Sequence, residues 1–126
     1  MLFRSATTAL QVYFAQNSEA LLSEGVYYPP MGAMARAKAG KINSGNAAFL
    51  ARTLLPEGHF LHLREGKQQL AEELQARLKS TAHDAALLSS EFFCDVEPNT
   101  LDTFLDMTRA WGYQPKVLFC ARDQAD

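Results

Sequence analysis

The chain has 126 residues, 12 basic against 14 acidic side chains, and a formal net charge of −2 at pH 7. This balance gives no basic footprint for nucleic acid, and no apolar run approaches the roughly 20 residues that a membrane-spanning helix needs. Because 48 % of the residues are hydrophobic and no tract is of low complexity, the composition is typical of a folded chain, and we expect one domain over 1–126.

The two cysteines and the first residues of the chain indicate the compartment in which we expect the protein. Cys94 and Cys120 match no metal or redox spacing, and no basic segment followed by a long apolar run opens the sequence. We therefore expect two free thiols in a reducing cytoplasm, and no secretory signal.

The first half of the chain predicts two helices separated by an extended segment and a loop. Apolar residues at helical spacing predict a helix over 7–24. The β-prone segment 26–28 follows and is stopped by two prolines. Residues 31–45 are rich in Ala, Gly and Lys and predict a surface loop with three cations, which could contact an acceptor. A short helix is expected over 46–55.

The second half alternates between helix and strand. A short extended piece is expected over 59–63, and leucines at four-residue spacing predict an amphipathic helix over 66–81. The apolar run 85–88 predicts a buried strand. A helix capped by Asn99 and a second buried strand over 116–120 follow.

This alternation predicts the fold class and the place of the chemistry. Helices between strands imply parallel strands joined by right-handed crossovers, which gives an α/β layer sandwich. Polar residues follow both predicted strands, at 89–91 and at 122–123. Because α/β proteins bind ligands at the carboxyl ends of their strands, we expect the site there.

An anion-binding motif stands before the first predicted helix. Residues 4–8 read Arg-Ser-Ala-Thr-Thr and combine a cation, small residues and hydroxyls with a helix start. Free N–H groups at a helix N-terminus bind phosphate or sulfate. Capping by the hydroxyls explains the same spacing, and on spacing alone it is the simpler interpretation.

Several segments resemble the sulfotransferase family, in particular its bacterial members. Residues 4–11 resemble the family's phosphosulfate loop, Lys-[Ser/Thr]-Gly-Thr-Thr-x-Leu-Gln, and 25–29 are similar to its Gly-Val-x-Tyr-Pro segment. Residues 87–91 and 116–123 are similar to later parts of the family. The resemblance is spread over most of the chain, and the order and spacing of the segments carry it.

The resemblance implies a P-loop NTPase-like sulfotransferase fold, a three-layer parallel sheet with flanking helices. It also implies metal-free sulfuryl transfer from 3′-phosphoadenosine 5′-phosphosulfate to a hydroxyl or amine, such as that of a carbohydrate. Arg4 would assist the leaving group, Arg122 would bind the 3′-phosphate, and Glu91 is the candidate general base, with local capping as its alternative role. Four residues would cradle the 5′-phosphosulfate: Ser5, Ala6, Thr7 and Thr8.

The chain departs from the family pattern at both ends. Arg4 replaces a lysine and Ala6 a glycine, which puts proton donation and the shape of the cradle in doubt. Little of a strand precedes the loop, and the chain stops just after Arg122, so we expect an amino-terminal fragment, truncated at both ends and perhaps inactive. Residues 2–5 also match the translation of a common sequencing-adapter end, which would explain the missing strand and the Arg4 change.

Two other functions stay open at this point. One is another phosphate-loop nucleotide-binding protein, such as a small kinase, although the Gly-x-x-x-x-Gly-Lys-[Ser/Thr] spacing is absent. The other is a non-enzymatic module that binds a partner through the leucine face of 70–78. The three histidines and Trp111 are interpreted as structural, with His83 exposed in a turn, and no spacing predicts a metal site.

Overall fold

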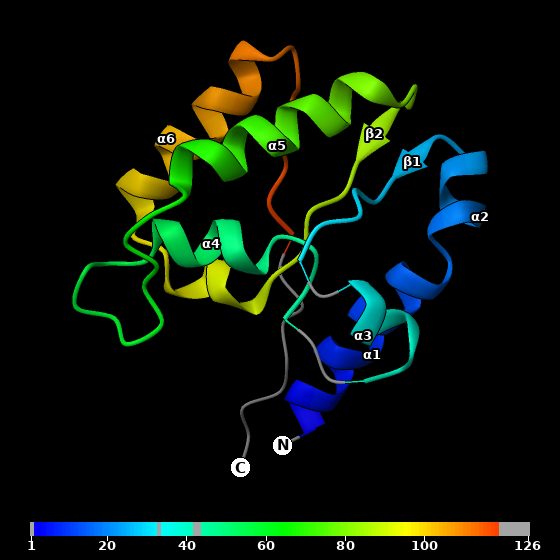
Figure 1. Ribbon diagram of the computed structural model, residues 1–126, viewed down its shortest axis with the longest axis horizontal. Coiled ribbons are helices and arrows are strands. Elements are labelled where there is room, and N and C mark those ends of the chain that lie inside the picture. The colour runs from blue at the N-terminus through cyan, green and yellow to red at the C-terminus, as the bar shows by residue number, and fades with distance from the viewer. Residues whose placement is uncertain (1, 33, 42–43, 119–126) are drawn as a thin grey trace.

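The computed structural model describes residues 2–32, 34–41 and 44–118, and of residues 2–8 the backbone (Figure 1). This part of the chain is mainly helical, with one small sheet. Its elements in chain order are α1 (Leu2–Gln16), α2 (Ser18–Ser23), β1 (Val26–Tyr27), α3 (Met34–Lys38), α4 (Ala48–Leu54), α5 (Lys67–Ser80), β2 (Ala85–Ala86), the 3-10 helix η1 (Glu91–Asp95) and α6 (Pro98–Ala110).

The sheet consists of β1 and β2, which pair in parallel with Val26 opposite Ala85 and Tyr27 opposite Ala86. The N–H of Leu87 continues the ladder to the carbonyl of Tyr27 at 2.9 Å. Two segments that the sequence predicts as extended thus pair in parallel. The described residues contain this two-stranded sheet alone, and the three-layer sandwich stays a prediction. Residues 116–118 form no strand, and 119–120 lie outside the described residues.

The first predicted helix is in fact two helices, and it begins earlier than expected. The break falls at Asn17, whose side-chain amide donates to the carbonyl oxygen of Tyr13 at 2.8 Å. The backbone N–H of Asn17 donates to the same carbonyl oxygen at 2.9 Å, so the side chain shares this acceptor with the backbone, and the next helix begins at Ser18. At the other end α1 starts at Leu2, so residues 4–8 are helical.

The remaining helices match the sequence with local differences. α4, α5 and α6 lie within a few residues of their predicted bounds. Glu97 rather than Asn99 occupies the N-cap of α6, because Pro98 suits the first helical position. The extended piece over 59–63 is wrong, since these residues form bends and turns, and the loop 31–45 contains the short helix α3.

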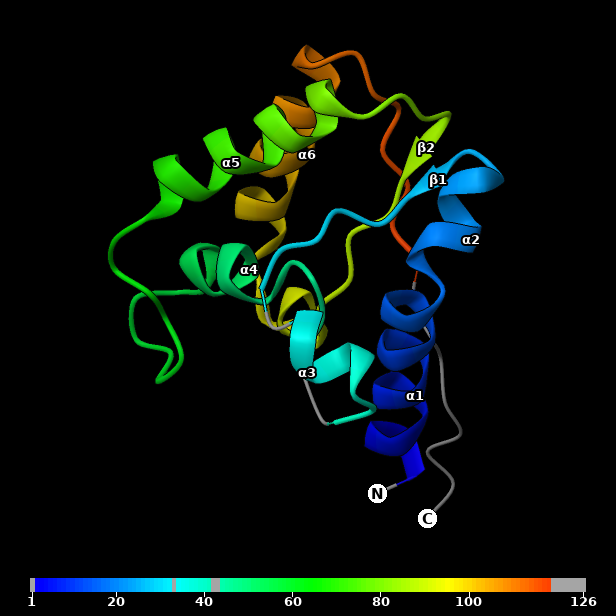
Figure 2. The ribbon, with the colours of Figure 1, turned by 45° about the vertical axis from the view of Figure 1, so that its right-hand side comes forward.

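Two apolar clusters hold the molecule together. Figure 2 shows α4, α5 and α6 gathered in one part of the molecule and α1 with α3 in another. The larger cluster joins α4, α5 and α6, and Leu74 of α5 is fully buried in it beside Leu50 and Phe104. The smaller cluster joins α1, β1 and α3 through Ala15, Tyr28 and Ala37. Within the described residues, no helix has the length and apolar character that crossing a bilayer requires.

Candidate functional site

The carboxyl ends of the two parallel strands meet in a buried group of polar side chains. Tyr28 directly follows β1, is 2 % exposed, and lies with its phenol oxygen 2.8 Å from Oγ of Ser89, which follows β2. Open α/β sheets bind their ligands at this edge. The strand-end cluster, defined as Tyr28, Asn46 and Ser89, is therefore the natural starting point for a site.

Asn46 ties the two strand ends to each other. Its Nδ2 donates to the carbonyl oxygens of Pro29 at 3.0 Å and Leu87 at 3.1 Å. Its Oδ1 accepts from the N–H of Ser89 at 2.8 Å, and its own N–H donates to the phenol oxygen of Tyr28 at 3.3 Å. Because both amide hydrogens and the amide oxygen are used, Asn46 fixes the distance between the strand ends.

The backbone before Asn46 passes very close to the second strand end. Gly45 has φ +93°, and a Cβ built on it would lie 2.0 Å from the carbonyl oxygen of Ser89. The same carbonyl accepts from the N–H of Ala47 at 3.1 Å. Position 45 therefore requires glycine for two reasons, its left-handed backbone and this close approach.

The acid–base state of the strand-end cluster follows from its burial. Burial raises the pKa of Tyr28 above its ordinary value of 10.0, and the hydrogen bonds with Ser89 and Asn46 act in the opposite direction. The phenol is therefore protonated at neutral pH and does not act as a general base there. The cluster positions the residues that follow it.

Glu91 lies just beyond this edge, as the first residue of η1, and it is exposed. Ser90 is the N-cap of η1, because its Oγ accepts from the N–H of Phe92 at 3.1 Å. Within the described part of the chain the Glu91 carboxylate makes no ion pair. It is thus free to meet a ligand at the strand ends, as the sequence hypothesis of a general base needs.

The residues of the motif 4–8 belong to a different element from this edge. Arg4, Ser5, Ala6, Thr7 and Thr8 belong to the first two turns of α1, where the sequence predicts a loop that enters a helix at Thr7. Arg122 lies outside the described residues. The expected juxtaposition of these residues with the guanidinium at 122 stays a prediction.

Further along α1 lies a buried polar residue that the sequence pattern does not predict. Gln11 is 3 % exposed, and its Oε1 has no hydrogen-bond partner among the described residues. It closes the motif 4–11 and lies one helical turn before the buried Ala15. Only the position of Gln11 at the end of the motif 4–11 could have indicated it as a candidate.

The cations of the predicted loop 31–45 lie beside α1. Helix α3 packs against α1 in both ribbon views (Figures 1 and 2), and Nε2 of Gln16 donates to the carbonyl oxygen of Lys38 at 3.1 Å. Arg36 and Lys38 occupy the last turn of α3. The structure thus places basic residues next to the helix that carries the anion motif.

His83 is not the exposed turn residue that the sequence predicts. Its Nδ1 lies 2.6 Å from the carbonyl oxygen of Thr81, so Nδ1 carries the hydrogen. Nε2 of the neutral ring then accepts from the hydroxyl of Tyr113 at 2.8 Å, and the ring packs on Tyr27 at a centroid distance of 5.4 Å. Burial raises the pKa of Tyr113. The group ties the segment after α6 to β1.

A second histidine joins the 56–63 segment to η1. The N–H of Leu61 donates to Nδ1 of His59 at 3.1 Å, so Nε2 carries the hydrogen and faces Oδ2 of Asp95 at 3.1 Å. Because both nitrogens are used and Asp95 is exposed, this pair holds a loop in place.

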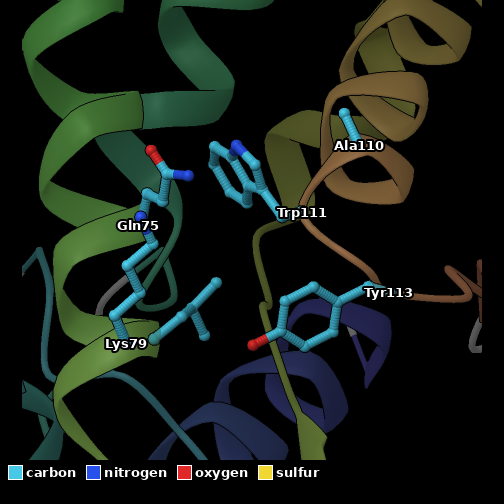
Figure 3. A pocket seen from close by; sticks show the side chains of 6 residues that line it. Gln75, Lys79, Ala110, Trp111 and Tyr113 are labelled. Atoms are coloured by element: carbon cyan, nitrogen blue, oxygen red, sulfur yellow. The ribbon is translucent and has the colours of Figure 1, made fainter.

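A hollow of about 270 Å³ opens between the carboxyl ends of α5 and α6 (Figure 3). The side chains of Gln75 and Trp111 approach each other across it, and Tyr113 borders it. It is smaller than the roughly 300–1,000 Å³ of ordinary ligand sites. We assign it no function.

Among the described residues, no three His, Cys, Asp or Glu side chains are grouped so that they could hold a metal ion. Comparisons with protein-family models, with curated proteins and with solved structures find no match to this chain.

Proposed function

We propose that the chain is a sulfotransferase-like protein that binds 3′-phosphoadenosine 5′-phosphosulfate and transfers its sulfuryl group to a hydroxyl or amine, such as that of a carbohydrate. The resemblance of residues 4–11, 25–29, 87–91 and 116–123 to that family is the basis of the proposal.

One structural observation supports the proposal most. Segments 25–29 and 87–91, which carry two parts of the resemblance, are about sixty residues apart in the chain, yet 25–29 contains β1 and 87–91 directly follows β2, its parallel partner. Their carboxyl ends are joined by the Tyr28–Ser89 hydrogen bond and by Asn46. A donor site at the carboxyl edge of a parallel sheet requires this neighbourhood.

In the proposed reaction the protein mainly positions the donor and the acceptor. The acceptor oxygen or nitrogen attacks sulfur, the sulfur–oxygen bond to the 5′-phosphate breaks, and the acceptor proton passes to the carboxylate of Glu91. Arg4 would balance the charge that develops on the departing phosphate, and Arg122 would bind the 3′-phosphate through its planar fork of donors.

The helical backbone of residues 4–8 adds a condition to the proposal. Amides inside a helix donate to the carbonyl four residues earlier, so those of Ala6, Thr7 and Thr8 are engaged within α1. They can bind a phosphosulfate only after the first two turns open. Nucleotide binding is therefore expected to lower the helicity of this segment.

The two alternative functions are an interaction module and a phosphate-loop kinase. The leucine face of α5 is covered by the protein itself, because Leu74 is buried in the core and Leu70 and Leu78 pack against it. This packing argues against an interaction module that uses that face. A phosphate-loop kinase would differ in needing Mg²⁺ for tight nucleotide binding, whereas sulfuryl transfer does not.

Thermal unfolding of the chain with adenosine 3′,5′-bisphosphate, with and without Mg²⁺, tests the proposal. We expect a melting temperature that rises with nucleotide concentration and does not depend on Mg²⁺. Thr7→Ala and Arg122→Ala should each reduce the rise. Their matched controls are Thr103→Ala and Arg77→Ala, on the exposed faces of α6 and α5, which should leave it unchanged.

The result that would overturn the proposal is an unchanged melting temperature at millimolar nucleotide, and a rise that requires Mg²⁺ would favour the kinase alternative. The role of Glu91 is tested separately by an assay of sulfuryl transfer. Glu91→Gln should abolish transfer and retain nucleotide binding, whereas Glu72→Gln, exposed on α5, should retain both.

A further inference from the structure

A second hollow, of about 590 Å³, opens at the far end of α5 from the first one. We call it the α5-start hollow, and its volume lies within the range of ordinary small-ligand sites. It lies between the last turn of α4, the segment after it and the first turn of α5. The residues that line it are Thr53, Glu57, His62, Leu63, Arg64 and Lys67.

The wall that carries His62 is fixed by Arg52 of α4. The Nε of Arg52 donates to the carbonyl oxygen of Leu61 at 2.8 Å, and the carbonyl oxygen of Arg52 accepts from the N–H of Leu63 at 3.1 Å. Both neighbours of His62 are therefore held by one residue. These hydrogen bonds hold this wall of the hollow in place, although the wall is formed by a segment without regular secondary structure.

The charge of the α5-start hollow is positive in a chain whose net charge is negative. Arg64 and Lys67 line it against the single carboxylate of Glu57. In the described part of the chain neither cation makes an ion pair, and the three pairs that do form lie elsewhere. Two cations are thus available to an anion that enters the hollow.

The helix start at the rim adds to this positive charge. Gly66 is the N-cap of α5, with φ +92°, and provides no side-chain cap. The first turn contains no acidic residue and begins with Lys67, the opposite of what the helix dipole favours. The first N–H groups of α5 therefore lack the usual side-chain acceptor.

An independent observation comes from His62. Its Nδ1 atom is shielded from solvent and has no hydrogen-bond partner among the described residues. A buried polar atom without a partner is costly, and because Nδ1 is shielded, a ligand in the hollow meets it only when the ring turns toward the hollow. The residue His62 lines the same hollow as the two unpaired cations.

We propose that the α5-start hollow binds a small organic anion whose negative group is a tetrahedral oxyanion, a phosphate or sulfate ester on a body of about sugar size. Arg64 and Lys67 neutralise the oxyanion, and the N–H groups that open α5 donate to it. His62 meets a polar group of the ligand, and Glu57 accepts from a hydroxyl. The site does not depend on the sulfotransferase proposal.

Titration of the isotope-labelled chain by nuclear magnetic resonance tests this site, with glucose 6-phosphate, glucose 6-sulfate, glucuronate and uncharged glucose as probes. We expect saturable shifts of the amides of Gly66 and Lys67 and of the His62 ring with the first two probes. A response to only one ester identifies which oxyanion the site takes, and glucuronate and glucose should bind at least several-fold more weakly.

Variants tie the response to the lining residues. Arg64→Ala combined with Lys67→Ala should weaken binding by about tenfold or more, since each cation contributes a charge-assisted hydrogen bond. The matched control is Lys79→Ala, at the other end of the same helix, which should bind as the parent chain does. Circular dichroism confirms that the variants fold. Absent shifts with both esters, or equal binding by the double variant, would overturn the proposal.

Discussion

At the carboxyl ends of β1 and β2, the side chains of Tyr28, Asn46 and Ser89 all have hydrogen-bond partners, in one another or in the adjacent backbone. At the start of α5 the opposite holds, because Arg64 and Lys67 make no ion pair within the described residues and Nδ1 of His62 has no partner there. The strand-end cluster is closed and buried, while the α5-start hollow is open and charged.

The difference separates groups that stabilise the fold from groups kept for a ligand. A fully satisfied buried network stabilises a fold and fixes its geometry. Unpaired like charges at a helix start lower stability, and they persist in proteins where binding needs them. Substitutions in the first region should therefore unfold the chain, and substitutions in the second should spare or stabilise it.

The largest effect is expected at Gly45. Gly45→Ala places a Cβ against the Ser89 carbonyl in a left-handed backbone, and should lower the free energy of unfolding by about 3 kcal/mol or more in urea titrations. Gly112→Ala, with φ +97° and open space, should cost only about 1 kcal/mol. Gly58→Ala meets nothing within 4 Å and should be nearly neutral. Equal effects at all three positions would contradict the close approach.

Asn46→Ala should have the next largest effect. It leaves the carbonyls of Pro29 and Leu87 and the N–H of Ser89 without their partner, at a cost of about 2 kcal/mol in the free energy of unfolding. Asn99→Ala, exposed in the first turn of α6, is the control and should change stability little. A mild Asn46→Ala phenotype in urea unfolding would mean that the strand ends are joined in another way.

Tyr28→Phe should have a smaller effect, of about 1 kcal/mol, and it should change the pH dependence. The pKa of Tyr28 is raised in the folded chain, so the unfolded chain releases its phenol proton first as pH rises above about 10. Stability should fall there, and less steeply in Tyr28→Phe. Chemical unfolding across alkaline pH measures this, with the exposed Tyr13→Phe as control. Identical profiles for parent and variant would refute the burial argument.

The smallest effect is expected in the hollow, and it has the opposite sign. Lys67→Glu replaces a cation in the first turn of α5 by an anion, and should raise stability by about 0.5 kcal/mol without ligand. Lys79→Glu, in the last turn, should lower it by a similar amount. Thermal unfolding at low salt measures both. A destabilised Lys67→Glu chain would mean that the lysine has a structural partner.

Periodicity predicted the elements that depend on local pattern. The leucines of α5 gave its bounds closely, and the apolar runs gave both strands of the parallel pair, although each strand is shorter than its run. The break at Asn17 depends on one side chain that donates to the helix backbone. The spacing of apolar residues does not predict such a break. The turns over 59–63 depend in part on a contact between His59 and the N–H of Leu61.

The site was less predictable, because its contacts are distant in sequence. Asn46 joins residues 17 and 41 positions away, and His83 meets a tyrosine 30 positions away. Neither residue belongs to a motif. The α5-start hollow did carry a sequence signal, since a helix whose first turn begins with a lysine and contains no acid is unusual. The resemblance to the sulfotransferase family indicates the motif at 4–8 as the site instead.

The most direct test of the proposed function is a residue-resolved titration of the labelled chain with adenosine 3′,5′-bisphosphate. The sulfotransferase proposal predicts saturable changes at the amides of residues 4–8 and at Arg122, with loss of helical carbon shifts in the first two turns of α1. Absence of any change, or changes confined to Gly66 and Lys67, would contradict it.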